Sequence, residues 1–414
     1  MISIAKPYLG EEEAHAASEV ILSGWVTQGP KVKEFEEIFR EYVGSEYACA
    51  VSNCTTALHL SLIAVGVMPG DVVITVSHSF IATANSIRHC GAEPVFIDIK
   101  QKTFNMDPQL LEEFLAKECS MYNEKLYYNN VNSIAIKESP LKYIASKKIG
   151  RVAAIIPVHQ MGMPCEINKI AEVSKKFNIP VIEDAACAIG SEILQGERWV
   201  KVGKPIGDIV CFSFHPRKVI TTGEGGMITS DNDDYVSKVR LLRQHAMDIS
   251  DTIRHNSRSI ITENYLKTGY NYRMTDIQAA VGVEQMKKLT KIIKERRYID
   301  TIYRDALSCI SWLEAPYQPE NVRSNWQSYP VKVLKNAPIS RDKIIQFLLD
   351  NGIASKPGIM NSHLEKPYSY NHWELAFSEM ARNNIFLLPV FIGMNQEEIE
   401  LIHDTILKLN QLEI

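Results

Sequence analysis

Short apolar runs alternate with amphipathic stretches over the first two thirds of the chain, and this alternation constrains the fold more than any other feature. The strand candidates are residues 47–51, 72–76, 94–97, 152–158, 179–183, 209–214 and 227–229. Between several of them, apolar residues recur at helical spacing, at 56–65, 81–89, 108–117 and 167–176. Strands that alternate with helices predict a doubly wound α/β sheet with mostly parallel strands. In such sheets, ligands bind beyond the carboxyl ends of the strands.

The pattern changes after about residue 230 to long helical stretches at 235–245, 275–289 and 293–307. A shorter α+β segment follows, with a strand at 328–333 and helices at 342–351 and 397–409. We therefore expect a large domain over residues 1–250, followed by interdomain helices and a smaller domain over residues 251–414. Residues 118–150 have no sustained period and predict a long loop, such as a surface excursion or a subunit contact.

Net charge, apolar runs and cysteine spacing limit the kinds of molecule that this chain is expected to bind. The 414-residue chain has a net charge of −4, which gives no electrostatic footprint for nucleic acid or for an anionic membrane. Neither a signal peptide nor an apolar run long enough to span a membrane is evident. The eight cysteines contain no C-x-x-C pair and predict reduced thiols in a cytoplasmic protein, not disulfides or a zinc site. Small molecules and other protein chains are the expected partners.

Lys218 stands between the strand candidate 209–214 and the glycine-rich residues 223–226. Its neighbours His215 and Arg217 are expected to disfavour the charged form of its amine. A lysine of lowered basicity can act as a nucleophile and form a Schiff base. Asp184 ends another strand candidate. A lysine for the covalent link and an aspartate for a pyridinium nitrogen are the pair that pyridoxal 5′-phosphate (PLP) requires.

Three further segments lie at predicted strand ends. The turn 52–56 can cap the following helix and leave the amides of Thr55 and Thr56 for a phosphate, and Ser213 can add a hydroxyl. Phe80 can stack on a cofactor ring. Each residue also has an ordinary structural explanation, as a helix cap, a turn serine or a core phenylalanine. The cofactor hypothesis therefore depends on all of these residues occurring together, in this order and at the ends of predicted strands.

Taken in order, these segments resemble the DegT-type sugar aminotransferases, which are fold-type I PLP enzymes that act on nucleotide-linked keto sugars. The matching stretches are 23–30, 54–59, 80–84, 158–162, 183–186, the segment around Lys218, and 269–280. They extend over about residues 5 to 400 and leave only 118–150 unmatched. The resemblance implies a large domain with a mostly parallel seven-stranded sheet flanked by helices, and a smaller α+β C-terminal domain.

The resemblance also implies roles around the cofactor ring. Lys218 would bind PLP covalently and then move the proton between substrate and cofactor. Asp184 would pair with the pyridine nitrogen, and Phe80 would cover one ring face. Cys187 would lie beside the phenolic oxygen, where the family usually has a stronger donor such as Gln or His. A thiol is a weaker hydrogen-bond donor, so this contact is expected to be weaker than in the family.

The remaining implied roles concern the phosphate and the substrate. The amides of Thr55 and Thr56, with Ser213, would hold the phosphate. Asn271 would reach the phosphate in the neighbouring subunit, so that a homodimer with shared sites is required for activity. Thr27 and His363 fall where the family touches its sugar nucleotide. Cys54 replaces a frequent glycine, which would be a strained choice if that backbone needs a positive φ.

We expect a ping-pong, PLP-dependent aminotransferase. It would take an amino group from L-glutamate and pass it to a nucleotide-diphosphate keto sugar, for an amino sugar of a surface polysaccharide such as an O-antigen. Three alternatives stay open. A PLP-dependent sugar dehydratase would carry histidine in place of Lys218, and an amino-acid transaminase or lyase would need an arginine for an α-carboxylate, which no motif marks. A regulatory protein could keep the fold without turnover.

Overall fold

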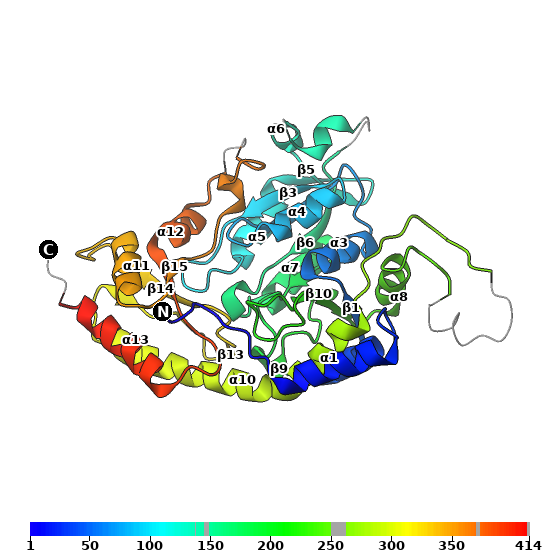
Figure 1. The fold of residues 1–414 in the computed structure, drawn as a ribbon. Helices are drawn as coiled ribbons and strands as arrows, with labels where there is room; N and C mark the ends of the chain where they lie inside the picture. Colours follow the sequence, from blue (N-terminus) through cyan, green and yellow to red (C-terminus); the bar gives the residue numbers. More distant parts are fainter. Residues whose placement is uncertain (137, 145–148, 250–261, 370–372, 412–414) are drawn as a thin grey trace.

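The computed structural model describes residues 1–136, 138–144, 149–249, 262–369 and 373–411. A large α/β unit and a smaller α+β unit lie side by side along the long helix α10 (Asp276–Ser308), as Figure 1 shows. The predicted domain boundary at 250/251 lies outside the described residues. We propose a two-domain division with α10 as the connecting helix.

The central sheet of the large unit contains seven strands within the described residues. In spatial order these are β3 (Glu93–Ile97), β2 (Val72–Val76), β6 (Val152–Ile156), β7 (Ile182–Asp184), β10 (Ile209–Ser213), β11 (Gly226–Ser230) and β1 (Tyr47–Val51). The neighbours from β3 to β10 are parallel, with β6 joined to β7 through bridges at Ile155–Val181 and Val158–Asp184. β11 runs antiparallel to both of its neighbours. The predicted seven-stranded, mostly parallel sheet is confirmed.

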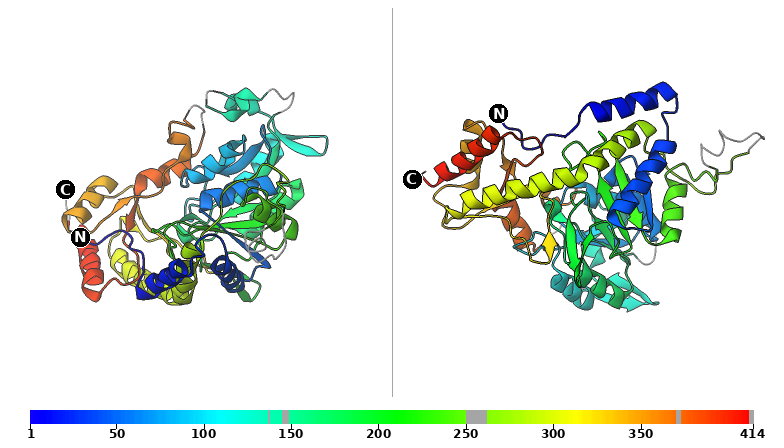
Figure 2. Two further views of the ribbon diagram at one scale, coloured as in Figure 1. Left: turned by 45° about the vertical axis from the view of Figure 1, so that its right-hand side comes forward. Right: turned by 90° about the horizontal axis from the view of Figure 1, so that it is seen from below.

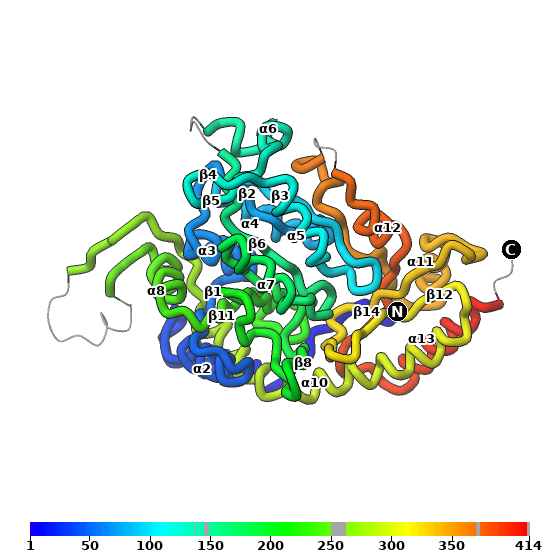
Figure 3. Tube along the Cα trace, turned by 180° about the vertical axis from the view of Figure 1, so that it is seen from behind, coloured from blue at the N-terminus to red at the C-terminus, as the bar shows by residue number. Residues whose placement is uncertain are grey.

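Successive residues of each strand point to opposite faces of this sheet and belong to two different hydrophobic cores. In β1, Cys49 and Val51 pack with α3 (Cys54–Ala64), α4 (Ala82–His89) and α8 (Asp233–Leu242). Ala48 and Ala50 face the other way, toward α2 (Pro30–Val43), α5 (Pro108–Lys117) and α7 (Ile167–Phe177). Strands buried on both faces explain the near-continuous Val and Ile runs in the sequence. Figure 3 shows the second helical layer from behind.

The smaller unit has its own antiparallel sheet and its own core. Its strands are β12 (Leu313–Glu314), β14 (Tyr329–Val333), β16 (Ile385–Leu388) and β15 (Lys356–Pro357), and its helices are α11 (Arg341–Asp350), α12 (Ala376–Asn384) and α13 (Gln396–Leu409). Ile2 pairs with Ile353, which places the N-terminus beside this unit (Figure 1). Further elements outside these two sheets are α1 (Glu11–Ser23), β8 (Glu192–Gln195), β9 (Arg198–Lys201), β13 (Val322–Arg323), and the short 3-10 helices Gln160–Gly162 and Ser362–Leu364.

The prediction of two helices at 275–289 and 293–307 is wrong, because α10 is continuous over 33 residues. Residues 290–292 contain neither Gly nor Pro to interrupt it. Ala279 to Ile293 pack into the large core, and Ile299 to Leu307 pack into the small one. Figure 2 shows α10 running beneath both units. None of the helices in the described part of the chain has the length and hydropathy to cross a bilayer.

The prediction of a long loop at 118–150 is also wrong for much of this segment. It contains a hairpin of β4 (Cys119–Tyr122) and β5 (Lys125–Tyr128), followed by α6 (Val131–Ile134) and the 3-10 helix Pro140–Tyr143. Residues 137 and 145–148 lie outside the described residues. Leu126 and Leu141 are buried in the large core, so this segment is a packed part of the fold.

Candidate active site

A cavity of about 790 Å³ opens between the carboxyl ends of the central strands and the small unit. This volume suits a small-molecule site. The large unit contributes residues from 53–59, 79–83, 184–187 and 213–218, and the small unit contributes 356–360 and 387–390. The cavity lining includes seven of the predicted site residues: Thr55, Thr56, Phe80, Asp184, Cys187, Ser213 and Lys218. The expected convergence of the strand ends is therefore observed.

Lys218 lies on a tightly closed turn. Its amide donates to His215 O at 2.8 Å, and Thr221 Oγ1 donates to Phe214 O at 2.7 Å. These two hydrogen bonds hold Lys218 and the residues after it against the end of the preceding strand. The Nζ atom of Lys218 lies 3.1 Å from the Sγ atom of Cys187. The turn therefore fixes where the amine enters the cavity.

The prediction that the Lys218 amine has a lowered pKa is wrong for the cofactor-free chain. Burial lowers the pKa of its amine, but Cys187, Cys54 and Asp184 outweigh burial and hold the pKa above its ordinary value. His215 and Arg217 are sequence neighbours, whereas the groups that act on the nitrogen are thiols and a carboxylate. The free amine is therefore mostly protonated near neutral pH.

This charge state makes covalent cofactor loading dependent on pH. Only the neutral amine attacks an aldehyde, so the loading rate should rise about tenfold per pH unit between pH 7 and pH 9. Rapid mixing of cofactor-free protein with PLP measures it, with n-butylamine as the reference amine at each pH. A rate that levels off in this range, while that of butylamine still rises, would show that the pKa is low instead.

Asp184 is buried at the end of β7 and is held from two sides. Its Oδ2 atom accepts from Thr83 Oγ1 at 2.8 Å, and its Oδ1 atom accepts from the Ala186 amide at 3.1 Å. Burial raises the pKa of this carboxyl, although the two hydrogen bonds and the charge of Lys218 oppose the rise. A carboxylate fixed in this way can face a protonated ring nitrogen, as PLP chemistry requires.

The N-terminus of α3 differs in detail from the prediction. The Thr56 amide already donates to Asn53 Oδ1 at 2.9 Å, in a capping box. The helix offers no acceptor to the amides of Cys54 and Thr55, because the first amides of a helix have none. These amides, with Ser213 at the end of β10, fit a phosphate group. Cys54 is not among the residues with positive φ in the described ranges, so it carries no backbone strain.

Gly226 lets β11 approach this helix end closely. A Cβ atom at this position would lie 2.5 Å from the backbone carbon of Asn53. A larger residue would therefore displace the turn that presents the Thr55 amide. Phe80 lines the same cavity and is 64% exposed, so its ring is free to cover a planar ligand. The donor set, the buried acid and the exposed ring together fit PLP.

Three predicted site residues lie outside the cavity lining of a single chain. Thr27 and Asn271 are exposed on the surface. His363 is buried, and its ring nitrogens lie 2.6 Å from Ser77 Oγ and 3.3 Å from Glu379 Oε1. The structure thus gives no support to a substrate contact by His363, and the roles of all three residues stay predictions.

Other cavity residues were not anticipated as site residues. Arg217 and Lys356 bring positive charge, and Gln160 and Gln327 bring amides. Arg217 stands inside the lysine motif, so its charge was a visible signal. Lys356 comes from the small unit, about 140 residues away in sequence, and no sequence pattern links it to the site.

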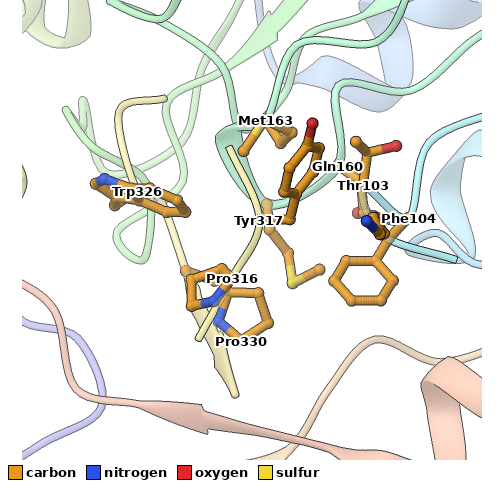
Figure 4. Close-up of a pocket in the computed structure, with 11 residues that line it drawn as sticks. Thr103, Phe104, Gln160, Met163, Pro316, Tyr317, Trp326 and Pro330 are labelled. Atoms are coloured by element: carbon orange, nitrogen blue, oxygen red, sulfur yellow. The ribbon is translucent and has the colours of Figure 1, made fainter. Parts of the chain in front are cut away.

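A second hollow at the seam between the two units is too small for a substrate (Figure 4). Its volume is about 10 Å³, which is room for roughly one water molecule. Phe104, Met161 and Trp326 line it and have φ values of 61°, 56° and 50°, which are uncommon for such residues. Gln160 belongs to both this hollow and the large cavity. The hollow therefore marks the packed contact between the units beside the site.

Comparisons with known proteins agree with this geometry. A family model described as the DegT/DnrJ/EryC1/StrS aminotransferase family matches residues 7–407. GDP-perosamine synthase from Caulobacter vibrioides is 34% identical, over 96% of this chain and 95% of that protein. Spore coat polysaccharide biosynthesis protein SpsC from Bacillus subtilis is 32% identical, over 95% and 93%. A putative sugar aminotransferase from Streptococcus pneumoniae, solved in its PMP form, superposes with a TM-score of 0.82 at 26% identity, covering 99% of each chain.

Proposed function

The chain belongs to the DegT/DnrJ/EryC1/StrS aminotransferase family of PLP-dependent sugar aminotransferases, and from this premise we propose its reaction. An amino group passes from L-glutamate to the keto group of a nucleotide-diphosphate sugar, and the amino sugar enters a surface polysaccharide such as an O-antigen. The similarity to GDP-perosamine synthase and to a spore coat polysaccharide protein supports this direction. The observation that carries it is that Lys218 and Asp184 line one cavity.

Each residue of the cavity has a part in this reaction. PLP, when bound, supplies an electron-poor ring that carries the amino group between the two substrates. Lys218 holds the cofactor and then moves a proton at the substrate carbon. Asp184 keeps the ring nitrogen protonated, while the amides of Cys54 and Thr55, with Ser213, hold the phosphate. Phe80 covers one face of the ring and excludes water there.

The site fits two alternatives less well than it fits an aminotransferase. A sugar dehydratase would carry histidine in place of Lys218, and this chain keeps the lysine. A regulatory protein without turnover would not need a lysine, a buried aspartate and helix amides on one cavity. We also propose a cytoplasmic location, since all eight cysteines are free thiols in the structure.

Spectroscopy tests the reaction directly. The PLP-loaded protein should change its absorbance when L-glutamate is added, and a keto sugar nucleotide should reverse the change. Trying keto sugars linked to UDP, GDP and dTDP would identify the nucleotide. A loaded protein that no amino acid converts would favour the regulatory alternative.

We further propose that two chains share each site, with Asn271 reaching the phosphate in the partner. Asn271 is exposed beside the start of α10 and lies outside its own cavity, as such a role requires. Asn271→Ala should weaken PLP retention about tenfold or more, because one hydrogen bond to a charged group is lost. Dialysis followed by measurement of bound PLP checks this.

Mixed dimers of Asn271→Ala and Lys218→Ala chains provide the control. One of the two sites would then combine an intact lysine with an intact asparagine, so that site should keep PLP through dialysis as wild type does, and the mixture should be more active afterwards than either homodimer. Mixed dimers whose activity after dialysis does not exceed that of the Asn271→Ala protein would contradict the shared site.

A further inference from the structure

Two positive side chains that line the cavity have no counter-ion among the described residues. Arg217 comes from the turn before Lys218, and Lys356 comes from β15 of the small unit. Within the described part of the chain, neither side chain has a hydrogen bond or an ion pair. By contrast, the buried Arg243 is paired with Glu36 at 2.6 Å. The cavity therefore gathers positive charge that the fold itself does not neutralise.

The pKa of Lys356 is lowered by its surroundings. Burial lowers the pKa of its amine, and the charges of Arg217 and Lys218 lower it further. Glu224 also lines the cavity, but its charge acts on His215, and the described structure records no ion pair from it to either cation. Lys356 is half-buried, whereas Arg217 is exposed at the cavity, so the nearby like charges cost free energy mainly at Lys356, and an anionic ligand would recover this cost.

This pair differs in chemistry from the helix end that fits the cofactor phosphate. The helix end offers amides and a hydroxyl, all from the large unit. Arg217 and Lys356 offer full charges, and an arginine can hold a carboxylate with two parallel hydrogen bonds. The pair also bridges the two units. A second acidic group, separate from the cofactor phosphate, is the ligand that this arrangement suits.

We propose that Arg217 and Lys356 form a second anion site, which binds the α-carboxylate of the amino donor. The proposal rests on the transamination proposed above. An α-carboxylate is bonded to the carbon whose amine reacts, so it must lie close to the Lys218 amine. The diphosphate of the other substrate is separated from its keto group by the sugar ring. Arg217 directly precedes Lys218, and Lys356 senses the charges of both residues, so this pair is better placed for the carboxylate.

The test follows the first half-reaction in the PLP-loaded protein. Arg217→Gln and Lys356→Gln should each raise the L-glutamate concentration at half-maximal rate about 10-fold to 100-fold, as the loss of a charge-assisted hydrogen bond implies. Arg217→Lys should recover part of the loss. Lys335→Gln, a neutralised exposed lysine of the same small unit, should behave as wild type. Bound PLP and melting temperature identify any variant that fails to fold.

Inorganic pyrophosphate separates the two sources of negative charge. If the site binds the carboxylate, the half-saturating glutamate concentration rises in both variants, while pyrophosphate inhibits the second half-reaction as in wild type. If glutamate saturation is unchanged and pyrophosphate inhibition is lost, the site serves the diphosphate and the proposal is overturned. Unchanged behaviour toward both probes overturns it as well. A wild-type protein that no amino acid converts would instead refute the proposed function itself.

Discussion

Lys218→Ala should abolish turnover, with a fall in kcat of more than about 10⁴-fold, while PLP still binds without a covalent link. The amine is both the attachment point and the proton carrier, and it enters the cavity 3.1 Å from Cys187 Sγ. Asp184 and the end of α3 remain to hold the cofactor. Steady-state assays with L-glutamate and a keto sugar nucleotide measure the loss, and gel filtration with absorbance measures the retained PLP.

Two variants make this result specific. Lys218→Arg keeps the positive charge beside Cys187 and Asp184 but cannot form the covalent link, so it should be as inactive as alanine. Lys204→Ala removes a half-exposed lysine that pairs with Asp231 at the surface and should keep full turnover. Normal turnover in either Lys218 variant would overturn the assignment of this residue.

Asp184→Asn should lower kcat by about 10²-fold to 10³-fold, the usual cost of removing one preorganised electrostatic partner. Asparagine keeps the shape and can still accept from the Ala186 amide, but it has no charge to hold a ring nitrogen protonated. Single-turnover conversion by L-glutamate measures the loss without the second substrate. Activity within threefold of wild type would show that this carboxylate does not face the ring.

The same substitution should not destabilise the cofactor-free protein. Burial raises the pKa of Asp184 in the folded chain, so the folded state binds this proton more readily than the unfolded state. The ionised carboxyl therefore costs stability at every pH above its folded pKa. Asp184→Asn removes that cost, and its melting temperature at pH 7 should equal or exceed that of wild type. A clear fall in melting temperature would contradict this account of the burial.

The central sheet could be predicted because its strands are short, buried and rich in Val and Ile, and because helical spacing separates them. The hairpin at 119–128 could not. Its turn depends on positive φ at Asn123 and Glu124, and only the asparagine is a usual residue for such a turn. The continuity of α10 was missed for another reason. The first half of α10 packs into the large core and the second half into the small one. The spacing of its apolar residues therefore changes along the helix, and the sequence pattern resembled two helices.

The site was predictable in its order but not in its electrostatics. Asp184 and Ser213 end strands and Lys218 follows one, so their convergence follows from parallel topology. The groups that raise the pKa of the Lys218 amine are Cys54, from the start of α3, and Asp184 and Cys187, from the end of β7 and the residues after it. Their approach to one nitrogen depends on the folded chain and has no signal in local sequence.

Borohydride reduction of the PLP-loaded protein, followed by peptide mapping, tests the central claim most directly. Reduction makes the link between PLP and its lysine permanent and leaves a mass tag on that residue. The account predicts a single tag on the peptide that contains Lys218, and no tag in the Lys218→Ala protein. A tag on another lysine, or no tag on a protein that contains PLP, would contradict it.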